Sequence, residues 1–458
     1  MRSKLEVLTR ATYRRVKAPG PPALPFLLNV AQFRKDPLAG FFQATLQYGD
    51  IVRYRGFWIT HQLTNPSQIQ HVLQTNFPNY RKGRDYKILR SSLGEGLLTS
   101  ENPLWQKQRK MTQPAFHSQR IAAAIRIMDA HTQTMLQRWD GPVSRKEVFD
   151  LIPDLMHLTL NIVSQALFTT SLESDTEAIG RTLHIGRDYS VNQAWSIIRL
   201  PHTFPSERNR LYREALAGFH RIIDRMIADR RRSPDGADDL LAMLMEARDD
   251  NGDPMSDKQL RDELATLLTA GHETTTLTLS WACFLIAQHP EVQEQVRAEI
   301  EMLNGKAPGF DEIAKLRYTR MVLEETMRLY PPVWVLSRAA VQDDEIDGYY
   351  IPADSEILIF PYITHRHPGW WDRPEEFVPE RFSSTNTVSR QRYAYLPFGG
   401  GPRTCIGLSF AMTEVLVVLT LILQRFRLRL PDQARSVQMD PSVTLRPIPG
   451  VFLELSRA

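Results

Sequence analysis

Apolar residues recur at helical spacing along most of the chain, and strand-like patterns are confined to short stretches. An apolar residue at every third or fourth position predicts a helix with one buried face. This pattern covers residues 103–232, 257–288, 291–303, 315–330 and 407–424. β-branched and aromatic residues predict a strand pair over 51–65, and short strand-like segments follow residue 331. The chain is therefore predicted to have a mainly α fold with a smaller β portion, in the α+β class.

Residue types at the ends of these segments indicate where helices begin. Asp36 is a predicted N-cap, followed by Pro37 at the first helical position. The longest helix is predicted to begin at Ser256 or Asp257. Residues 80–103 are rich in Gly and Ser and are predicted to form a loop.

We found no internal repeat and no long flexible linker, so residues 26–458 are predicted to form a single domain. Residues 1–25 are predicted to be a basic leader followed by a proline-rich connector. Residues 1–17 hold six basic residues and one acidic residue. They could lie on an anionic membrane surface, or they could be a solvated helix or a frayed tail.

Composition excludes several classes of protein. Outside the leader, 50 basic residues face 51 acidic ones, a balance that gives no support for a nucleic-acid-binding body. The chain has no uninterrupted run of about 18 apolar residues, so no membrane span is predicted. The N-terminus lacks the apolar segment of a signal peptide. Two cysteines cannot form a disulfide framework, and their rarity fits a reducing cytosol. A cytoplasmic location is predicted, with membrane association through residues 1–17 left open.

Cys405 lies in the segment FGGGPRTCIG, directly before an apolar helix, whereas Cys283 lies in an apolar run typical of a core residue. A helix N-terminus and the nearby Arg403 favour a thiolate at Cys405. Flanking glycines permit a large planar ligand to approach the backbone closely. One thiolate is too few for structural zinc or an iron–sulfur cluster, but haem iron needs only one axial thiolate.

The segment Phe398-x-x-Gly401-x-Arg403-x-Cys405-x-Gly407 resembles the cysteine-loop signature of the cytochrome P450 family. The resemblance extends over roughly residues 35–455, and the missing membrane anchor is similar to soluble bacterial members. It implies a helix-rich lobe and a small β lobe around a buried haem b, with Cys405 as the iron ligand. The haem-binding residues that it implies are Trp105, Arg109, Ala270, Gly271, Arg338, Phe398, Arg403, Cys405 and Gly407.

The segment Ala270-Gly271-His272-Glu273-Thr274-Thr275 resembles the oxygen-binding part of the long central helix of that family. Glycine inside a helix costs about 1 kcal/mol relative to alanine, so Gly271 is expected to leave room above the haem. Thr274 is expected to hydrogen-bond the bound oxygen, and Glu273 to deliver protons. A zinc site is excluded because the second histidine of H-E-x-x-H would fall on Thr276.

Glu325 and Arg328 are one helical turn apart and can pair. Alone, they would be an ordinary surface ion pair or a structural one. With Arg381, in the segment PERF, they resemble a buried network of the family that braces the haem loop. The histidines of THRHP, His365 and His367, have no third metal ligand and are interpreted as part of a solvated loop.

The chain has no recognisable flavin or nicotinamide fingerprint, because Thr404 stands where the dinucleotide motif needs glycine. The resemblance therefore implies that electrons come from a separate ferredoxin with its reductase, or from a flavoprotein reductase. The expected substrate-lining segments are mostly apolar: 86–98, 185–200, Leu267 with Ala270, and 333–336. They predict a hydrophobic substrate, and the stretch 331–336 resembles family members that act on long lipids such as fatty acids, terpenoids or carotenoids. A basic cluster over 81–90 could bind a substrate carboxylate, or it could form a solvated or haem-facing loop.

The function predicted is a monooxygenase that inserts one atom of dioxygen into such a substrate. Two alternatives remain. A haem-thiolate peroxygenase or isomerase would not need dioxygen, although the retained Glu273-Thr274 pair argues against it. A haem sensor or electron carrier would need a second axial ligand, and no residue other than His272 suggests itself for that role.

Overall fold

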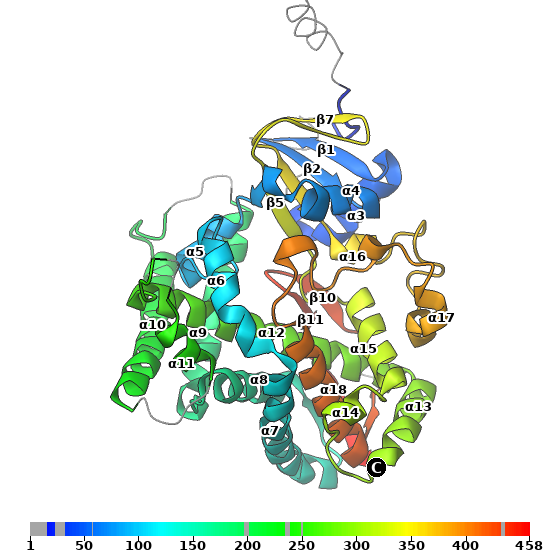
Figure 1. Ribbon diagram of the computed structural model, residues 1–458. Coiled ribbons are helices and arrows are strands. Elements are labelled where there is room, and N and C mark those ends of the chain that lie inside the picture. Colours follow the sequence, from blue (N-terminus) through cyan, green and yellow to red (C-terminus); the bar gives the residue numbers. More distant parts are fainter. Residues whose placement is uncertain are drawn as a thin grey trace, which may run out of the picture.

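The structure is a computed structural model that describes residues 16–22, 33–56, 58–196, 201–233, 239–248, 251–431 and 436–458. Helices dominate it (Figure 1). The helices are α3 (Pro37–Tyr48), α4 (Pro66–Gln70), α5 (Tyr86–Leu93), α6 (Leu104–Thr112), α7 (Ser118–Ser144), α8 (Ile152–Phe168), α9 (Thr176–Ala194), α10 (Glu207–Arg232), α11 (Leu240–Glu246), α12 (Asp257–Gln288), α13 (Pro290–Ile300), α14 (Phe310–Ile313), α15 (Arg317–Leu329), α16 (Pro361–Thr364), α17 (Ser384–Thr387) and α18 (Leu408–Arg425).

The strands form one larger sheet and three small ones. The larger sheet has the order β1-β2-β8-β5-β3, in which only β2 and β8 run parallel. It lies at one end of the molecule, and most helices lie at the other (Figure 1). The strands are β1 (Ile51–Arg55), β2 (Ile59–Leu63), β3 (Tyr80–Lys82), β4 (Val148–Asp150), β5 (Leu336–Ala340), β6 (Asp344–Ile346), β7 (Tyr349–Ile351), β8 (Glu356–Ile359), β9 (Phe426–Arg429), β10 (Gln438–Pro441), β11 (Leu445–Ile448) and β12 (Phe452–Arg457). This architecture confirms the predicted helix-rich α+β fold.

Helix α12 runs through the centre of the helical lobe and packs against α8, α15 and α18. A capping box between Ser256 and Gln259 fixes its N-terminus, which confirms the predicted start. Towards its other end, the Trp281 ring stacks on Tyr330 at a centroid distance of 3.9 Å. The packing buries most of the helix, so an exposed side chain in the middle of α12 marks an open space inside the protein.

One described helix, α18, is long and apolar enough to cross a membrane, but 72% of that window is buried inside the protein. Its apolar side chains join the same core as α7, α12 and α15. The composition of α18 is therefore explained by its position in the core.

Most predicted elements are confirmed, including the Asp36 cap, whose carboxylate accepts a hydrogen bond from the Ala39 amide. The loop predicted for 80–103 is wrong in part, because β3 and the helix α5 lie within it. The α5 segment combines basic residues with Ile88, Leu89 and Leu93, so one face can pack while the other is solvated. The leader lies largely outside the described residues, as do residues 197–200 of the substrate-lining prediction.

Two carboxylates of α12 hold the chain that follows α5. Asp262 accepts a hydrogen bond from the Glu95 amide at 2.8 Å, and Glu263 accepts one from the Leu97 amide at 3.0 Å. Glu263 is fully buried, and burial raises its pKa to about 8. The carboxyl group is therefore mostly protonated at neutral pH in the folded protein.

We expect this carboxyl group to make the protein less stable as the pH rises. Its ordinary pKa is 4.5, so between pH 4.5 and about 8 the folded state binds more protons than the unfolded state, and stability falls across that window. Glu263→Gln keeps an acceptor for the Leu97 amide and should weaken this pH dependence. Urea unfolding from pH 5 to 9 measures it, with the exposed Glu95→Gln as control. An unchanged pH dependence in Glu263→Gln would contradict the assignment.

Candidate active site

The segment before α18 forms a tight loop that fixes Cys405. The Cys405 amide donates a hydrogen bond to the Phe398 carbonyl at 3.0 Å, which closes the loop. Gly401 adopts a φ of 65°, and a Cβ added there would lie 1.8 Å from the Leu73 carbonyl oxygen. Only glycine fits at this position. The loop is therefore held against the β lobe while the thiol is presented just before α18.

Cys405 faces an open space inside the protein. It is exposed, yet surrounding protein raises the pKa of its thiol through burial. The Gly407 amide and the charge of Arg109 oppose that rise. The expectation that Arg403 supplies the charge beside the sulfur is wrong, because Arg403 turns away to bind Ser100 and Glu101. Burial outweighs the helix terminus, so the thiolate needs a further cation to form.

Helix α12 presents a second exposed surface in the interior. Ala270 is exposed and Thr274 is half-buried, whereas their neighbours in the helix are mostly buried. The two lie one turn apart, and the Thr274 hydroxyl donates to the Ala270 carbonyl at 2.7 Å. The reason predicted for Gly271 is wrong, because a Cβ there would meet Val163 of α8 at 3.0 Å. Gly271 allows α8 to approach closely, and Ala270 faces the open space.

The Glu273 side chain contacts a different element than the Thr274 side chain does. Its Oε1 accepts hydrogen bonds from the Thr444 hydroxyl at 3.0 Å and from Arg446 Nη1 at 2.9 Å. Both partners belong to the hairpin formed by β10 and β11. Consecutive helical residues point about 100° apart, which explains why Glu273 contacts the hairpin while Thr274 does not.

The hairpin that binds Glu273 is itself held in place. The Trp281 indole donates to the Leu445 carbonyl at 3.0 Å, and the Trp334 indole donates to the Ser442 carbonyl at 2.9 Å. The Leu445 amide donates to the Pro332 carbonyl at 3.0 Å. The position of the Glu273 carboxylate is thus defined by a braced element outside α12.

His272 lies on the opposite side of α12 from the open space. Its side chain is buried, interacts with the Met156 backbone of α8, and has a pKa lowered by burial to about 4. It is therefore not placed to act as a second axial ligand.

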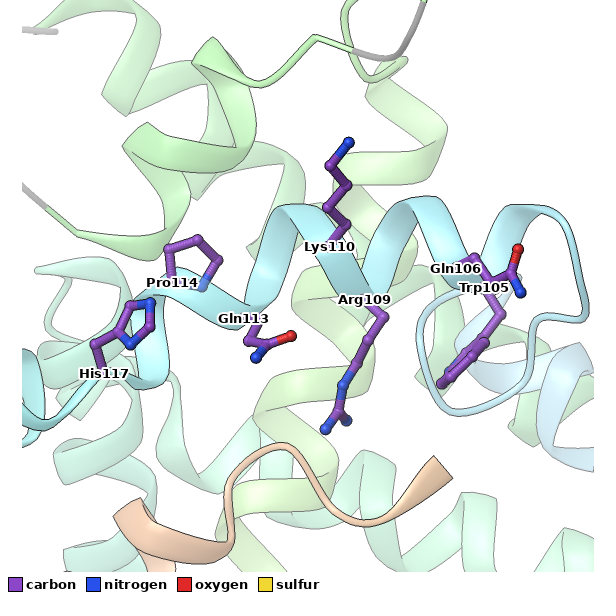
Figure 2. A pocket seen from close by; sticks show the side chains of 7 residues that line it. All are labelled: Trp105, Gln106, Arg109, Lys110, Gln113, Pro114 and His117. Carbon is purple, nitrogen blue, oxygen red and sulfur yellow. The ribbon is translucent and has the colours of Figure 1, made fainter. Parts of the chain in front are cut away.

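Three predicted haem-binding cations surround the cysteine loop. Arg109 of α6 donates to the Thr404 carbonyl at 2.9 Å, and Figure 2 shows it extending from α6 towards the neighbouring segment. Arg403 lies 4.5 Å from the Trp105 ring, and it binds Glu101 at 2.8 Å. Arg338 of β5 is buried, donates to the Ser337 carbonyl and has an Nε without a hydrogen-bond partner in the described part of the chain. An unsatisfied buried guanidinium nitrogen is costly unless an anion binds it.

These residues fit a haem. A single accessible thiol can serve as the axial ligand, and bound iron would supply the cation that the sulfur lacks. The buried arginines suit the two carboxylates of a porphyrin. The exposed faces of Ala270 and Leu408, the latter 36% exposed, are apolar surfaces that a flat ring could cover.

Glu325, Arg328 and Arg381 form the predicted network. Arg328 makes a fork of two bonds to Glu325 at 2.6 and 2.8 Å, and both side chains are fully buried. Arg381 lies 3.3 Å from the same carboxylate. Arg328 also donates to the carbonyls of His365, Pro374 and Glu376, at 2.6–2.9 Å.

The solvated-loop interpretation is wrong for His365, which is completely buried. Its Nε2 accepts a hydrogen bond from the Leu396 amide at 2.9 Å, and its Nδ1 lies 3.2 Å from the Arg328 carbonyl oxygen. His365 thus links the network to the chain that leads into the cysteine loop. No local pattern indicated this contact or the roles of Thr444 and Arg446, because each depends on contacts between distant segments. His367 is half-buried and pairs with Asp50.

A family model described as "Cytochrome P450" matches residues 18–455. The chain belongs to the cytochrome P450 family. Cyclooctatin synthase of Streptomyces melanosporofaciens is 35% identical to this P450, with 97% of this chain and 96% of the relative covered. Cyclooctat-9-en-7-ol 5-monooxygenase of the same organism is 33% identical, with 89% of each covered. Protein LUTEIN DEFICIENT 5, chloroplastic, of Arabidopsis thaliana is 31% identical, with 91% of this chain and 73% of the relative covered.

Membership makes this P450 an oxidoreductase of the monooxygenase family and implies a haem-thiolate iron cofactor. It also implies a hydrophobic substrate and a redox partner in general terms.

Proposed function

We propose that this P450 binds haem b through Cys405 and inserts one atom of dioxygen into a neutral, terpenoid-like substrate. The observation that carries the proposal is the accessible Cys405 thiol, which a closed glycine loop presents inside the protein. Bound there, the haem supplies the activation of dioxygen. Arg109, Arg338 and Arg403 would hold its carboxylates, and Trp105, Phe398, Gly407 and Ala270 would complete the surrounding surface.

The ligand assignment is tested by the absorption spectrum of the reduced protein with carbon monoxide. We expect the red-shifted Soret band of a thiolate-ligated complex in the wild type. Cys405→Ala should lose that band because it removes the only accessible thiol among the described residues. Cys283→Ala changes the buried cysteine and is the matched control. A wild-type band typical of histidine ligation, or no haem in folded protein, would contradict the proposal.

The arginines of the basic cluster over 81–90 support a neutral substrate over a fatty acid. Arg81 pairs with Asp354, and Arg84 donates to the Asp354 carbonyl. Arg90 donates to the Thr99 carbonyl at 2.6 Å. These guanidinium groups already bind protein acceptors, so they are poor anchors for a substrate carboxylate. The relative named for cyclooctat-9-en-7-ol, an unsaturated alcohol by its name, supports the same choice.

We expect a neutral isoprenoid such as geranylgeraniol to shift the ferric spin state at lower concentration than palmitic acid does. The apolar, half-buried Val333, Val335 and Leu336 favour such a ligand, because burying a carboxylate against apolar side chains costs free energy. Optical titration of both ligands measures the difference. Tighter binding of palmitic acid would favour fatty acids. With any ligand that shifts the spectrum, labelled dioxygen should place one labelled atom in the product.

Electrons are proposed to come from a separate ferredoxin or flavoprotein reductase. A depression of about 300 Å³ lies along α6 and is lined by Trp105, Arg109, Lys110 and His117, among others (Figure 2). Arg109 of this depression lies beside Thr404 of the cysteine loop. An acidic electron-transfer protein bound there would have charge complementarity and a short path to Cys405.

Glu273 and Thr274 are proposed to hold and deliver protons for the reaction. Glu273 is held by Arg446 and Thr444, next to the open side of α12. Glu273→Gln cannot release a proton, so product formed per NADPH should fall by about tenfold or more while the carbon monoxide spectrum stays normal. Turnover with a surrogate reductase measures this, with the surface variant Glu454→Gln as control. Normal coupling in Glu273→Gln would remove Glu273 from the mechanism. Turnover by peroxide alone in the wild type would assign the peroxygenase alternative.

A further inference from the structure

Lys82 lies on the enclosed side of its strand, although it belongs to a basic cluster that otherwise points to the surface. In β3, alternate residues point to opposite faces. Arg81 is exposed and pairs with Asp354. Lys82 turns inward, where its Nζ lies 4.1 Å from the centre of the Tyr86 ring. Its surroundings lower the pKa of the ammonium group well below the ordinary value, first through burial and then through Arg338 and Arg403.

The strand register places Lys82 directly opposite Arg338. The two residues are cross-strand partners in the antiparallel pair of β3 and β5. Like charges in that position repel each other and destabilise a sheet. Arg338 is buried and Lys82 is half-buried, so water screens the two charges only in part. Such a pair needs an anion to compensate it.

The carboxylate that faces this group in the described part of the chain is Glu101, and it is not enough. One oxygen of Glu101 accepts a bond from the Lys82 amide, and the other binds Arg403 at 2.8 Å. Three cations, Lys82, Arg338 and Arg403, therefore share one carboxylate, which leaves an excess of two positive charges. A porphyrin with two carboxylates carries the matching charge.

We propose that Lys82 binds a haem carboxylate together with Arg338 and Arg403, and that Glu101 orients Arg403 for the same purpose. The inference rests on the proposed haem site at Cys405. Lys82 then has a role in the holoprotein that opposes its effect on the apoprotein. Without the anion, the Lys82–Arg338 repulsion destabilises the β lobe; with it, the same charges hold the cofactor.

The experiment compares Lys82→Met, which keeps the length and removes the charge, with Lys82→Arg, which restores a charge. Lys87→Met is the matched control, because Lys87 is an exposed lysine of the same cluster. Haem release from each holoprotein to excess apomyoglobin is followed optically, and the ferric–ferrous reduction potential is measured by titration. Thermal unfolding of the haem-depleted proteins gives the stability of the apo form.

We expect Lys82→Met to release haem about tenfold faster than the wild type, since a charge-assisted hydrogen bond is lost. Its reduction potential should fall, because a cation near the site favours the added electron. Its apoprotein should melt at a higher temperature, because the repulsion is gone. Lys82→Arg should restore haem retention and potential, and Lys87→Met should match the wild type in all three.

Equal haem release and potential in Lys82→Met and Lys87→Met would overturn the inference while leaving haem binding at Cys405 intact. An apoprotein of Lys82→Met that is less stable than the wild type would also overturn it, because Lys82 would then be a structural residue. Absence of haem from the wild type would instead overturn the proposed function.

Discussion

A fully buried ion pair connects the parts of this P450 that form the active site. Arg328 of α15 is paired with Glu325, and its remaining N–H groups donate hydrogen bonds to three backbone carbonyls of the 365–376 segment. Removing one partner from such a pair leaves an uncompensated charge in the core, at a cost of about 3–5 kcal/mol. His365 extends the connection to Leu396, a few residues before the cysteine loop. The chain that leads into the cysteine loop is therefore held by a buried ion pair, and this fixes the position of the Cys405 thiol.

The region around Arg338, which is proposed to face the haem, instead carries an excess of positive charge. There, cations outnumber carboxylates, and a guanidinium nitrogen of Arg338 has no partner among the described residues. Cationic side chains that together bind an anion destabilise the protein when the anion is absent, because they then repel each other. The β lobe supplies Lys82 and Arg338 from paired strands, and the helical segment of this lobe that contains Leu73 lies against Gly401 of the cysteine loop. The same lobe therefore serves as both scaffold and binding surface.

Different faces of helix α12 contact different parts of the protein. Ala270 and Thr274 lie towards the open space, Gly271 lies against α8, and Glu273 is held by the β10–β11 hairpin. A hairpin braced by two indoles and a backbone bond holds that carboxylate in one place. Proton delivery and oxygen binding, as proposed, would then use neighbouring residues that are controlled by different parts of the fold.

Local patterns were sufficient for much of this molecule. Helical periodicity predicted the long helices, Asp36 and Ser256 marked the starts of α3 and α12, and the spacing around Cys405 indicated the family and the candidate site residues. These features depend on residues a few positions apart, which a sequence displays directly. The direction in which Glu273 points, the reason for Gly271, the burial of His365 and the opposition of Lys82 and Arg338 could not be obtained in that way. Each depends on a contact between segments distant in the chain, where the charge, the space and the solvent around a side chain are set by whichever element packs against it.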